Sequence, residues 1–162
     1  MEVAPSIRSA TAADSAAIRA LVGAALQEFG MQLESDGLDA DLDDVHASYI
    51  ENGGAFDVIV DATGALMGCV GIMPYDDVDG RRACELRKMY LRPGARGHGL
   101  GRLLLGRAID HAQRLGFETV VLETASILED AIALYERNGF VPFDAPHRAI
   151  RCNMAMRRDL AR

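Results

Sequence analysis

The sequence predicts an α/β fold built on an α+β mixed sheet, in which an antiparallel meander of strands is followed by a β-α-β-α-β-β order. Three observations support this prediction: short β-type segments between turn residues in the first half, one amphipathic helix in the middle, and alternating strands and helices after it. No internal repeat or low-complexity linker interrupts the 162 residues. We therefore expect a single domain over residues 1–162.

The N-terminal part is expected to be mainly helical. The segment 11–29 has apolar residues at helical spacing, and Thr11 with Asp14 resembles a capping box at its start. Glycine and aspartate mark 30–40 as a loop. The apolar spacing over 41–51 predicts a second short helix.

Three strands with short connections are expected next. Their predicted bounds are Phe56–Val60, Leu66–Met73 and Ala83–Leu91. The connections 61–64 and 76–81 carry the aspartate and glycine of tight turns. Sequential strands joined by short turns pair antiparallel, which predicts the meander.

The second half of the chain alternates between helix and strand. The predicted helices and strands are Gly101–Leu115 (helix), Thr119–Glu123 (strand), Leu128–Asn138 (helix), Phe140–Phe143 (strand) and Ile150–Met156 (strand). Gly116 and Gly139 stand where helix C-termini commonly place a glycine. The strand–helix–strand order from Ala83 to Glu123 predicts that the strands flanking the first helix run parallel.

Composition excludes several classes of protein. The net charge of −7 argues against nucleic acid as a partner, because phosphate binding draws on clustered lysine and arginine. No apolar run is long enough to span a membrane, and the N-terminus lacks the pattern of a secretion signal. Cys69, Cys84 and Cys152 have no metal-ligand spacing. We therefore expect a cytoplasmic protein with reduced thiols and no metal.

A glycine-rich stretch over 95–106, ARGHGLGRLLLG, joins the third predicted strand to the following helix. Gly97, Gly99 and Gly101 leave the backbone bare where unpaired N–H groups favour an anion such as a pyrophosphate, and Arg96 adds positive charge. The stretch is not the dinucleotide pattern GxGxxG, because arginine takes the place of the third glycine, and it lacks a P-loop ending. A glycine-rich turn that binds no ligand is the alternative.

Two motifs together resemble the GNAT superfamily of N-acetyltransferases. The strand CELRKMYLRP (84–93), followed by Arg-Gly-x-Gly-x-Gly, is similar to the acyl-CoA-binding motif of bacterial members, and AIALYERNGF (131–140) resembles a second family segment. The resemblance covers about Phe56 to Phe143 and implies a GNAT-like acyl-CoA N-acyltransferase fold with splayed central parallel strands. It also implies an enzyme that moves an acetyl group directly from acetyl-CoA to a primary amine of a small molecule or peptide.

Carried over by position, the resemblance implies a cofactor site made largely of backbone. Met89, Tyr90 and Leu91 would offer main-chain groups to the pantetheine arm. The residues implied to hold the pyrophosphate are Arg96, Gly97, His98, Gly99, Leu100, Gly101 and Arg102. For His98, an exposed loop histidine is the alternative. Many members carry an asparagine where this chain has Leu128, so one cofactor contact is expected to differ.

Two side chains are candidates for the transfer chemistry. The resemblance implies that Tyr135 is the general acid that protonates the departing thiolate, and a core tyrosine with a bonded hydroxyl is the alternative. Glu85 is the candidate base for the amine proton. An ion pair of Glu85 with Arg87 or a lysine at the rim of the sheet is its alternative.

Glu85 lies on a strand that flanks the expected opening between the splayed strands. Glu123, which ends the neighbouring strand, would help to position the acceptor. Strand alternation places the side chains of Glu85, Arg87 and Met89 on one face of this strand. The opposite face is expected to carry Cys84, Leu86, Lys88 and Tyr90.

An acidic group in the early loop bears on the choice of acceptor. Its members are Asp36, Asp39, Asp41, Asp43 and Asp44. Their field would suit a cationic acceptor such as a polyamine or a basic peptide end. The alternative is an ordinary solvated loop before a negatively charged helix start.

Two expectations concern partners. The last strand, around 152–156, and the hairpin edge are expected to join two copies into a homodimer, because an unpaired edge invites strand pairing. The alternative to an enzyme is a non-catalytic acyl-CoA-binding sensor or regulatory module.

Overall fold

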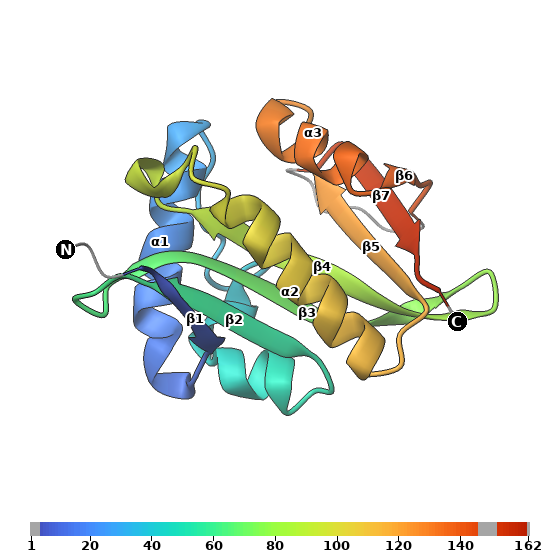
Figure 1. The fold of residues 1–162 in the computed structure, drawn as a ribbon, viewed down its shortest axis with the longest axis horizontal. Helices are drawn as coiled ribbons and strands as arrows, with labels where there is room; N and C mark the ends of the chain where they lie inside the picture. Colours follow the sequence, from blue (N-terminus) through green and yellow to red (C-terminus); the bar gives the residue numbers. More distant parts are fainter. Residues whose placement is uncertain (1–3, 146–151, 162) are drawn as a thin grey trace.

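A computed structural model describes residues 4–145 and 152–161, and its centre is one seven-stranded sheet (Figure 1). The strand order is β1-β2-β3-β4-β5-β7-β6. The strands are β1 (Ser6–Ser9), β2 (Ala55–Val60), β3 (Leu66–Val78), β4 (Arg81–Leu91), β5 (Thr119–Thr124), β6 (Val141–Pro142) and β7 (Met154–Asp159). β4 and β5 run parallel, and the other described pairs run antiparallel, which confirms the predicted mixed sheet.

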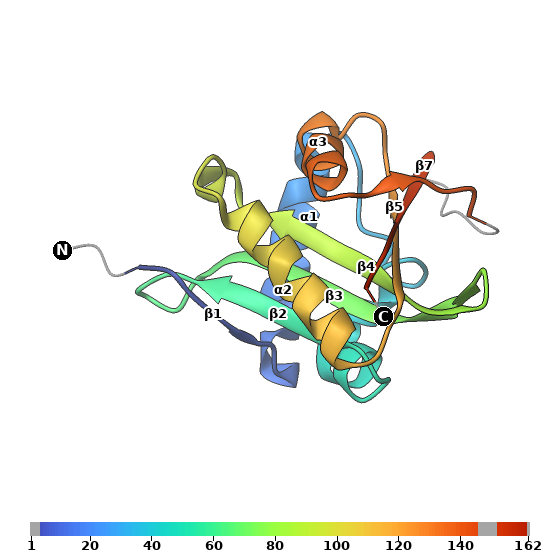
Figure 2. The same ribbon diagram turned by 45° about the vertical axis from the view of Figure 1, so that its right-hand side comes forward.

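The helices lie on both faces of the sheet. The α-helices of the described residues are α1 (Ser15–Glu28), α2 (Leu100–Arg114) and α3 (Glu129–Arg137). α2 crosses one face of the central strands, α1 lies on the opposite face, and α3 lies beside β5 and β7 (Figures 1 and 2). No helix in the described part of the chain combines the length and apolarity that a bilayer crossing requires.

The described residues form three buried hydrophobic clusters, and the two larger ones lie on opposite faces of the sheet. Leu104 of α2 packs with Leu86 and Tyr135 in one cluster, and Ile18 of α1 packs with Phe56 in the other. The two clusters hold α1 and α2 against the strands at fixed positions, because close-packed interiors resist small displacements.

The N-terminal part confirms one local prediction, adds a strand that was not predicted and corrects one predicted helix. The Asp14 carboxylate accepts the Thr11 N–H at 2.8 Å, as a capping box requires, ahead of a 3₁₀ turn, η1 (Ala12–Asp14), and α1. The sequence does not predict β1, because four mostly exposed residues leave little hydrophobic pattern. The helix expected over 41–51 is instead a 3₁₀ turn, η2 (Ala40–Asp43), and a π-helical turn, η3 (His46–Ile50), separated by an extended residue.

β4 and β5 separate at their carboxyl ends. Their ladder runs from Ala83 opposite Thr119 to Leu86 opposite Leu122. β4 then continues to Leu91 on its own, with no further β5 partner in the described residues, while it stays paired with β3 on its other edge. The predicted splay of the central parallel strands is therefore confirmed, and one edge of β4 is open over its last residues.

A bulge in β4 lies at the start of this open edge. The ladder with β3 pairs Tyr90 with Cys69 but Arg87 with Gly71, so two residues of β4 stand opposite one of β3. Lys88, inside the bulge, has a φ of 55°, in the left-handed region that side chains rarely adopt. The bulge brings the Lys88 carbonyl within 3.1 Å of the Cys69 thiol, which donates to it.

The bulge makes the predicted alternation wrong beyond Arg87. Met89 packs in the cluster beneath α2, and Tyr90 packs against the cluster beneath α1. The Lys88 side chain contacts carboxylates of the loop beside α1, and the Arg87 side chain contacts the backbone of the same loop. These two consecutive side chains therefore lie on the same face of β4. An inserted residue shifts every later side chain to the opposite face of a strand.

The C-terminal strand differs from its prediction in both bounds and position. β7 begins at Met154 rather than near Ile150, and residues 150 and 151 lie outside the described residues. β7 is not an edge strand, because it pairs with β5 on one side and with β6, through Met156 and Arg157, on the other. β1 and β6 form the edges of the sheet.

Candidate active site

The opening between β4 and β5 continues into a cleft of about 1340 Å³. Its walls come from the second half of β4, the end of β5, the glycine turn before α2, α3 along its length, and the loop after α1. Segments that are far apart in the sequence therefore meet at one end of the sheet (Figure 1).

The glycine turn forms one end of the cleft. Gly97 and Gly99 line it with φ values of 82° and 77°, a conformation that glycine adopts without strain. The Leu103 N–H donates to the Gly99 carbonyl at 3.2 Å as the helix begins, so the N–H groups ahead of it have no acceptor within the helix. These N–H groups and the helix dipole favour an anion at this end of the cleft.

Arginines surround this end, but one of them is already engaged. The Arg96 guanidinium lies 2.5 Å from the Glu28 carboxylate and above the Phe29 ring, which ties the turn to the end of α1. Arg102 and Arg137 are exposed and line the cleft from α2 and α3.

The open edge of β4 lines the middle of the cleft. Met89, Tyr90 and Leu91, to which the family resemblance assigns the pantetheine arm, line this part of the cleft. Two other candidates, His98 and Leu100, are not among the described residues that line it. Leu128 stands in the wall just before α3, where it offers a hydrocarbon surface rather than an amide.

Tyr135 reaches the cleft from α3. Its ring is buried, 5% exposed, and packs 5.8 Å from the Phe140 ring. Among the described residues, none forms a hydrogen bond with its hydroxyl group. Burial, with a smaller effect from Tyr90, raises the pKa of Tyr135, so the phenol keeps its proton at neutral pH. The hydroxyl is therefore free to donate to a group in the cleft.

Glu85 lies on β4 at the opposite end of the cleft from the glycine turn. Its carboxylate is 3.4 Å from the Arg87 guanidinium, so the predicted ion pair is present. Burial raises the pKa of Glu85; Glu123 and Asp41 raise it further, and Arg87 and Lys88 oppose the rise. Glu123, across the opening on β5, also lines the cleft.

The acidic loop is only partly exposed to solvent, whereas one of the two interpretations of its sequence was an ordinary solvated loop. Asp39 is fully buried and Asp41 nearly so, and both contact Lys88 at 3.2 Å. Asp43 is exposed, pairs with Arg19 at 2.7 Å and does not line the cleft within the described residues. The five carboxylates therefore do not form one field toward an acceptor.

Lys88 is the functional candidate that sequence reasoning missed. It is the only lysine in the sequence, and it lies in a strand whose neighbours are mostly apolar. A single lysine at a position that alternation assigns to the core was a signal, because a buried ammonium requires carboxylate partners.

A second cluster of ionisable groups lies away from the cleft. Asp57 of β2, 1% exposed, accepts from His111 at 2.9 Å and Arg107 at 3.1 Å, both on α2. Burial alone would raise the pKa of Asp57, but these two partners outweigh it and lower that pKa. The cluster fastens α2 to the sheet.

The remaining groups offer no second centre of chemistry. Burial raises the pKa of Cys84 to about 12, which leaves it protonated and unreactive at neutral pH. No three His, Cys, Asp or Glu side chains of the described residues converge to hold a metal ion.

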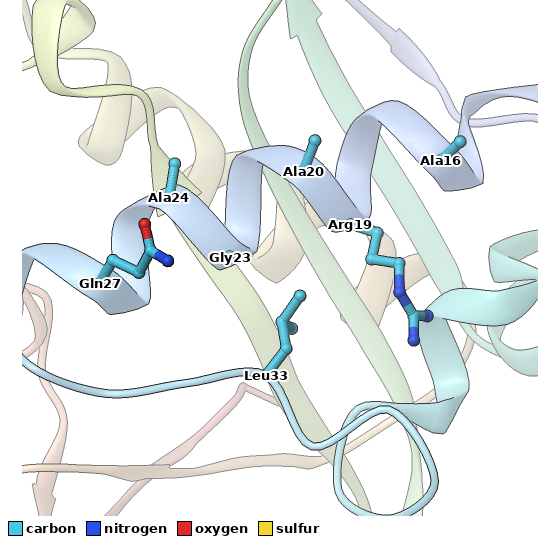
Figure 3. Close-up of a pocket in the computed structure, with 7 residues that line it drawn as sticks. All are labelled: Ala16, Arg19, Ala20, Gly23, Ala24, Gln27 and Leu33. Atoms are coloured by element: carbon cyan, nitrogen blue, oxygen red, sulfur yellow. The ribbon is translucent and has the colours of Figure 1, made fainter.

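A second, shallower pocket lies on the outer side of α1 (Figure 3). It is lined by Ala16, Arg19, Ala20, Gly23, Ala24, Gln27 and Leu33. Arg19 is the charged member and is engaged by Asp43, while the alanines and Gly23 have no polar side chain. This pocket therefore lacks groups that could perform chemistry.

The cleft thus joins the N–H groups at the start of α2, the end of β4 and the buried Tyr135, which is the arrangement that the resemblance to GNAT acyltransferases implies. The family model described as "Acetyltransferase (GNAT) family" matches residues 20–140. The chain belongs to this family of N-acetyltransferases, as the two motifs predicted.

Relatives and solved structures agree with this assignment. The chain is 37% identical over 120 residues to an uncharacterized N-acetyltransferase of Schizosaccharomyces pombe, covering 74% of this chain and 72% of that protein. It is 35% identical over 142 residues to the uncharacterized N-acetyltransferase YjgM of Escherichia coli, covering 86% and 84%.

Among solved structures, an acetyltransferase of the GNAT family from Staphylococcus aureus superposes with a TM-score of 0.88 at 20% identity, covering 98% of this chain and 100% of that one. The putative acetyltransferase yncA from Salmonella typhimurium, solved with its cofactor acetyl-CoA, gives a TM-score of 0.75 at 25% identity, covering 98% and 95%.

Proposed function

We propose that the cleft binds acetyl-CoA and transfers its acetyl group to a primary amine, and the open edge of β4 is the observation that carries this proposal. The unpaired N–H groups of 97–102 would receive the pyrophosphate at the helix start. From there β4 at 89–91, which extends beyond its ladder with β5, would pair with the amides of the pantetheine arm, as an added strand does. This path directs the thioester toward Tyr135.

The transfer itself needs a base and an acid. A lysine-like amine has a pKa of about 10 and must lose a proton before it attacks the thioester carbonyl. Glu85 takes that proton, directly or through water, and Glu123 orients the acceptor. The new C–N bond forms as the C–S bond breaks, and the Tyr135 hydroxyl donates a proton to the departing thiolate. The phenol keeps its proton at neutral pH, so a proton is in place when the thiolate forms.

Two measurements test the proposal together. Calorimetric titration with acetyl-CoA should show one binding site per chain, and a panel of spermidine, benzylamine, free L-amino acids and a tripeptide should release CoA thiol with at least one amine. Binding without release from any amine would favour an acyl-CoA sensor or regulatory module. Absence of heat with acetyl-CoA, CoA and longer acyl-CoA thioesters would contradict the proposed site.

We also propose that the protein works in the cytoplasm as a homodimer. Cys69, Cys84 and Cys152 are reduced thiols rather than disulfide partners, which supports a reducing compartment. The edges offered by β1 and β6 support strand pairing between copies. Light scattering at working concentration tests the dimer, and the mass of one chain would contradict it.

A further inference from the structure

Lys88 is bound on the loop side by two carboxylates. Its ammonium, 4% exposed, lies 3.2 Å from Asp39 Oδ1 and 3.2 Å from Asp41 Oδ1. The contact to Asp41 Oδ1 is an ion pair without hydrogen-bond alignment, and this buried oxygen has no hydrogen-bond partner among the described residues. Charged groups that are buried away from solvent remain ionised only when opposite charges compensate them.

The two carboxylates are in turn fixed within the loop. The other oxygen of Asp39 accepts the Glu34 N–H at 2.8 Å, and Asp41 accepts the hydroxyl of buried Tyr49. The ion pairs therefore fasten the loop as a body, and their other end is the bulge in β4.

The bulge is the reason that Lys88 can reach this loop. Regular alternation would turn Lys88 toward α2, whereas its φ of 55° directs it to the α1 side next to Arg87. A side chain in this region is strained, and the surrounding contacts must offset that strain. The pairs with Asp39 and Asp41 are the contacts that do so.

The same loop forms a wall of the cleft beside Glu85. Leu38 lines the cleft, and its carbonyl accepts from the Arg87 guanidinium at 3.3 Å. Arg87 also lies 4.0 Å from Asp41 and 3.4 Å from Glu85. A continuous chain of contacts thus runs from Asp39 and Asp41 in the loop, through β4, to the candidate base.

We propose that Lys88 is a positioning residue for acetyl transfer: its ion pairs with Asp39 and Asp41 hold the loop against the bulge in β4 and set the acceptor-side wall of the cleft. The inference rests on the proposed function, since it assigns a role within the same site. Lys88 acts through the loop and through Arg87, so acceptor binding should depend on it more than acetyl-CoA binding does.

The charge balance around Glu85 makes the pH profile a further readout. The charged and titratable groups that face this carboxylate come from β3, β4, β5 and η2, and they are Tyr75, Arg87, Lys88, Glu123 and Asp41. A variant that removes a charge from this set should shift the acidic limb of the rate profile. Lys88 lowers and Asp41 raises the pKa of Glu85, so a variant that neutralises both should shift the limb less than a variant that neutralises one of them.

The decisive variant neutralises the whole cluster at once: Lys88→Met with Asp39→Asn and Asp41→Asn. Removing Lys88 alone would strand two buried carboxylates and favour unfolding, whereas replacing every charge by a neutral side chain of similar volume commonly preserves the fold. Asp43→Asn is the matched control, because it makes the same chemical change on the same turn at an exposed ion pair. Asp39→Asn alone is the fallback variant, since its amide oxygen can still accept the Glu34 N–H.

For the folded triple variant we expect the KM for the panel amine that the wild type acetylates fastest to rise at least about fivefold. We expect the dissociation constant for acetyl-CoA to stay within about twofold, and hydrogen exchange over 31–44 to accelerate. Asp43→Asn should match the wild type in all three.

An unchanged amine KM together with unchanged exchange over 31–44 would overturn the role of Lys88. If the triple variant does not fold, Asp39→Asn decides by the same readouts, with a smaller shift expected. A wild type that acetylates no amine would instead count against the proposed function, and hydrogen exchange alone would then judge the loop contact.

Discussion

The two ends of the cleft are built from different parts of the chain. The end at the glycine turn consists mainly of backbone: N–H groups at the start of α2 and the open edge of β4. The opposite end consists of side chains, Glu85, Arg87 and Lys88, fixed by a loop almost fifty residues away in sequence. The backbone-built end suits a cofactor of constant structure, and the side-chain-built end can change with the acceptor. Substitutions at the two ends should therefore give separable effects.

Tyr135→Phe should produce the largest effect and leave the cofactor end untouched. The variant keeps the ring that packs on Phe140 but loses the proton donor, so we expect kcat to fall by about 100-fold or more. Calorimetric titration with acetyl-CoA measures binding at the cofactor end, and the rate of CoA thiol release measures the transfer step. Unchanged turnover would reduce Tyr135 to a packing residue.

Glu85→Gln should lower the rate less and change its pH dependence. A base must be ionised, so in the wild type kcat/KM should fall as the pH drops through the raised pKa of Glu85. The glutamine variant should lose this acidic limb and run about 10- to 100-fold slower near neutrality. An identical profile in both proteins would leave Glu85 as the ion-pair partner of Arg87 alone.

Gly99→Ala should weaken the cofactor end with little effect on chemistry. A Cβ at Gly99 meets no neighbouring atom, but its φ of 77° is strained for alanine, so the turn must shift and misdirect its N–H groups. We expect the dissociation constant for acetyl-CoA to rise about tenfold and kcat at saturation to change little. Gly94→Ala, equally open and without a positive φ, is the matched control, and equal weakening by both would remove the special role of Gly99.

Asp57→Asn should affect neither end directly and should lower stability. It removes the carboxylate that holds Arg107 and His111 of α2, and about 1–3 kcal/mol of unfolding free energy at pH 7 should be lost. The pKa of Asp57 is lower in the folded protein than in the unfolded chain. The stabilisation is therefore complete at pH values above the unfolded-state pKa, and it is lost as the pH falls through the folded-state pKa. Denaturant melts of both proteins, with exposed Asp110→Asn as control, should therefore converge in acid. A constant difference at every pH would contradict an ionic contribution.

The same contrast explains what the sequence could and could not predict. The glycine turn, the amphipathic helix after it and Tyr135 within LYERNGF are local patterns, so both motifs could be recognised along the chain. The splay of the parallel strands was implied by the family resemblance that these motifs carry. Short β1 left too little pattern to be recognised.

The acceptor end resisted prediction because it depends on one inserted residue in a strand. Alternation holds only while a strand is regular, and the bulge at Lys88 turns Met89 and Lys88 to faces opposite those expected. The burial of Asp39 and Asp41 depends on that same turn, because their partner comes from a distant strand. Composition alone made those carboxylates look like solvated charges.

The burial of Lys88 also concerns the protein's exposure to its own donor. Thioesters acylate accessible ε-amino groups without any catalyst, and proteins that concentrate them risk modifying themselves. This sequence has sixteen arginines and a single lysine, whose ammonium is sealed between two carboxylates. Guanidinium groups stay protonated and do not react in this way, so the chain has no solvent-facing lysine that its own donor could acylate.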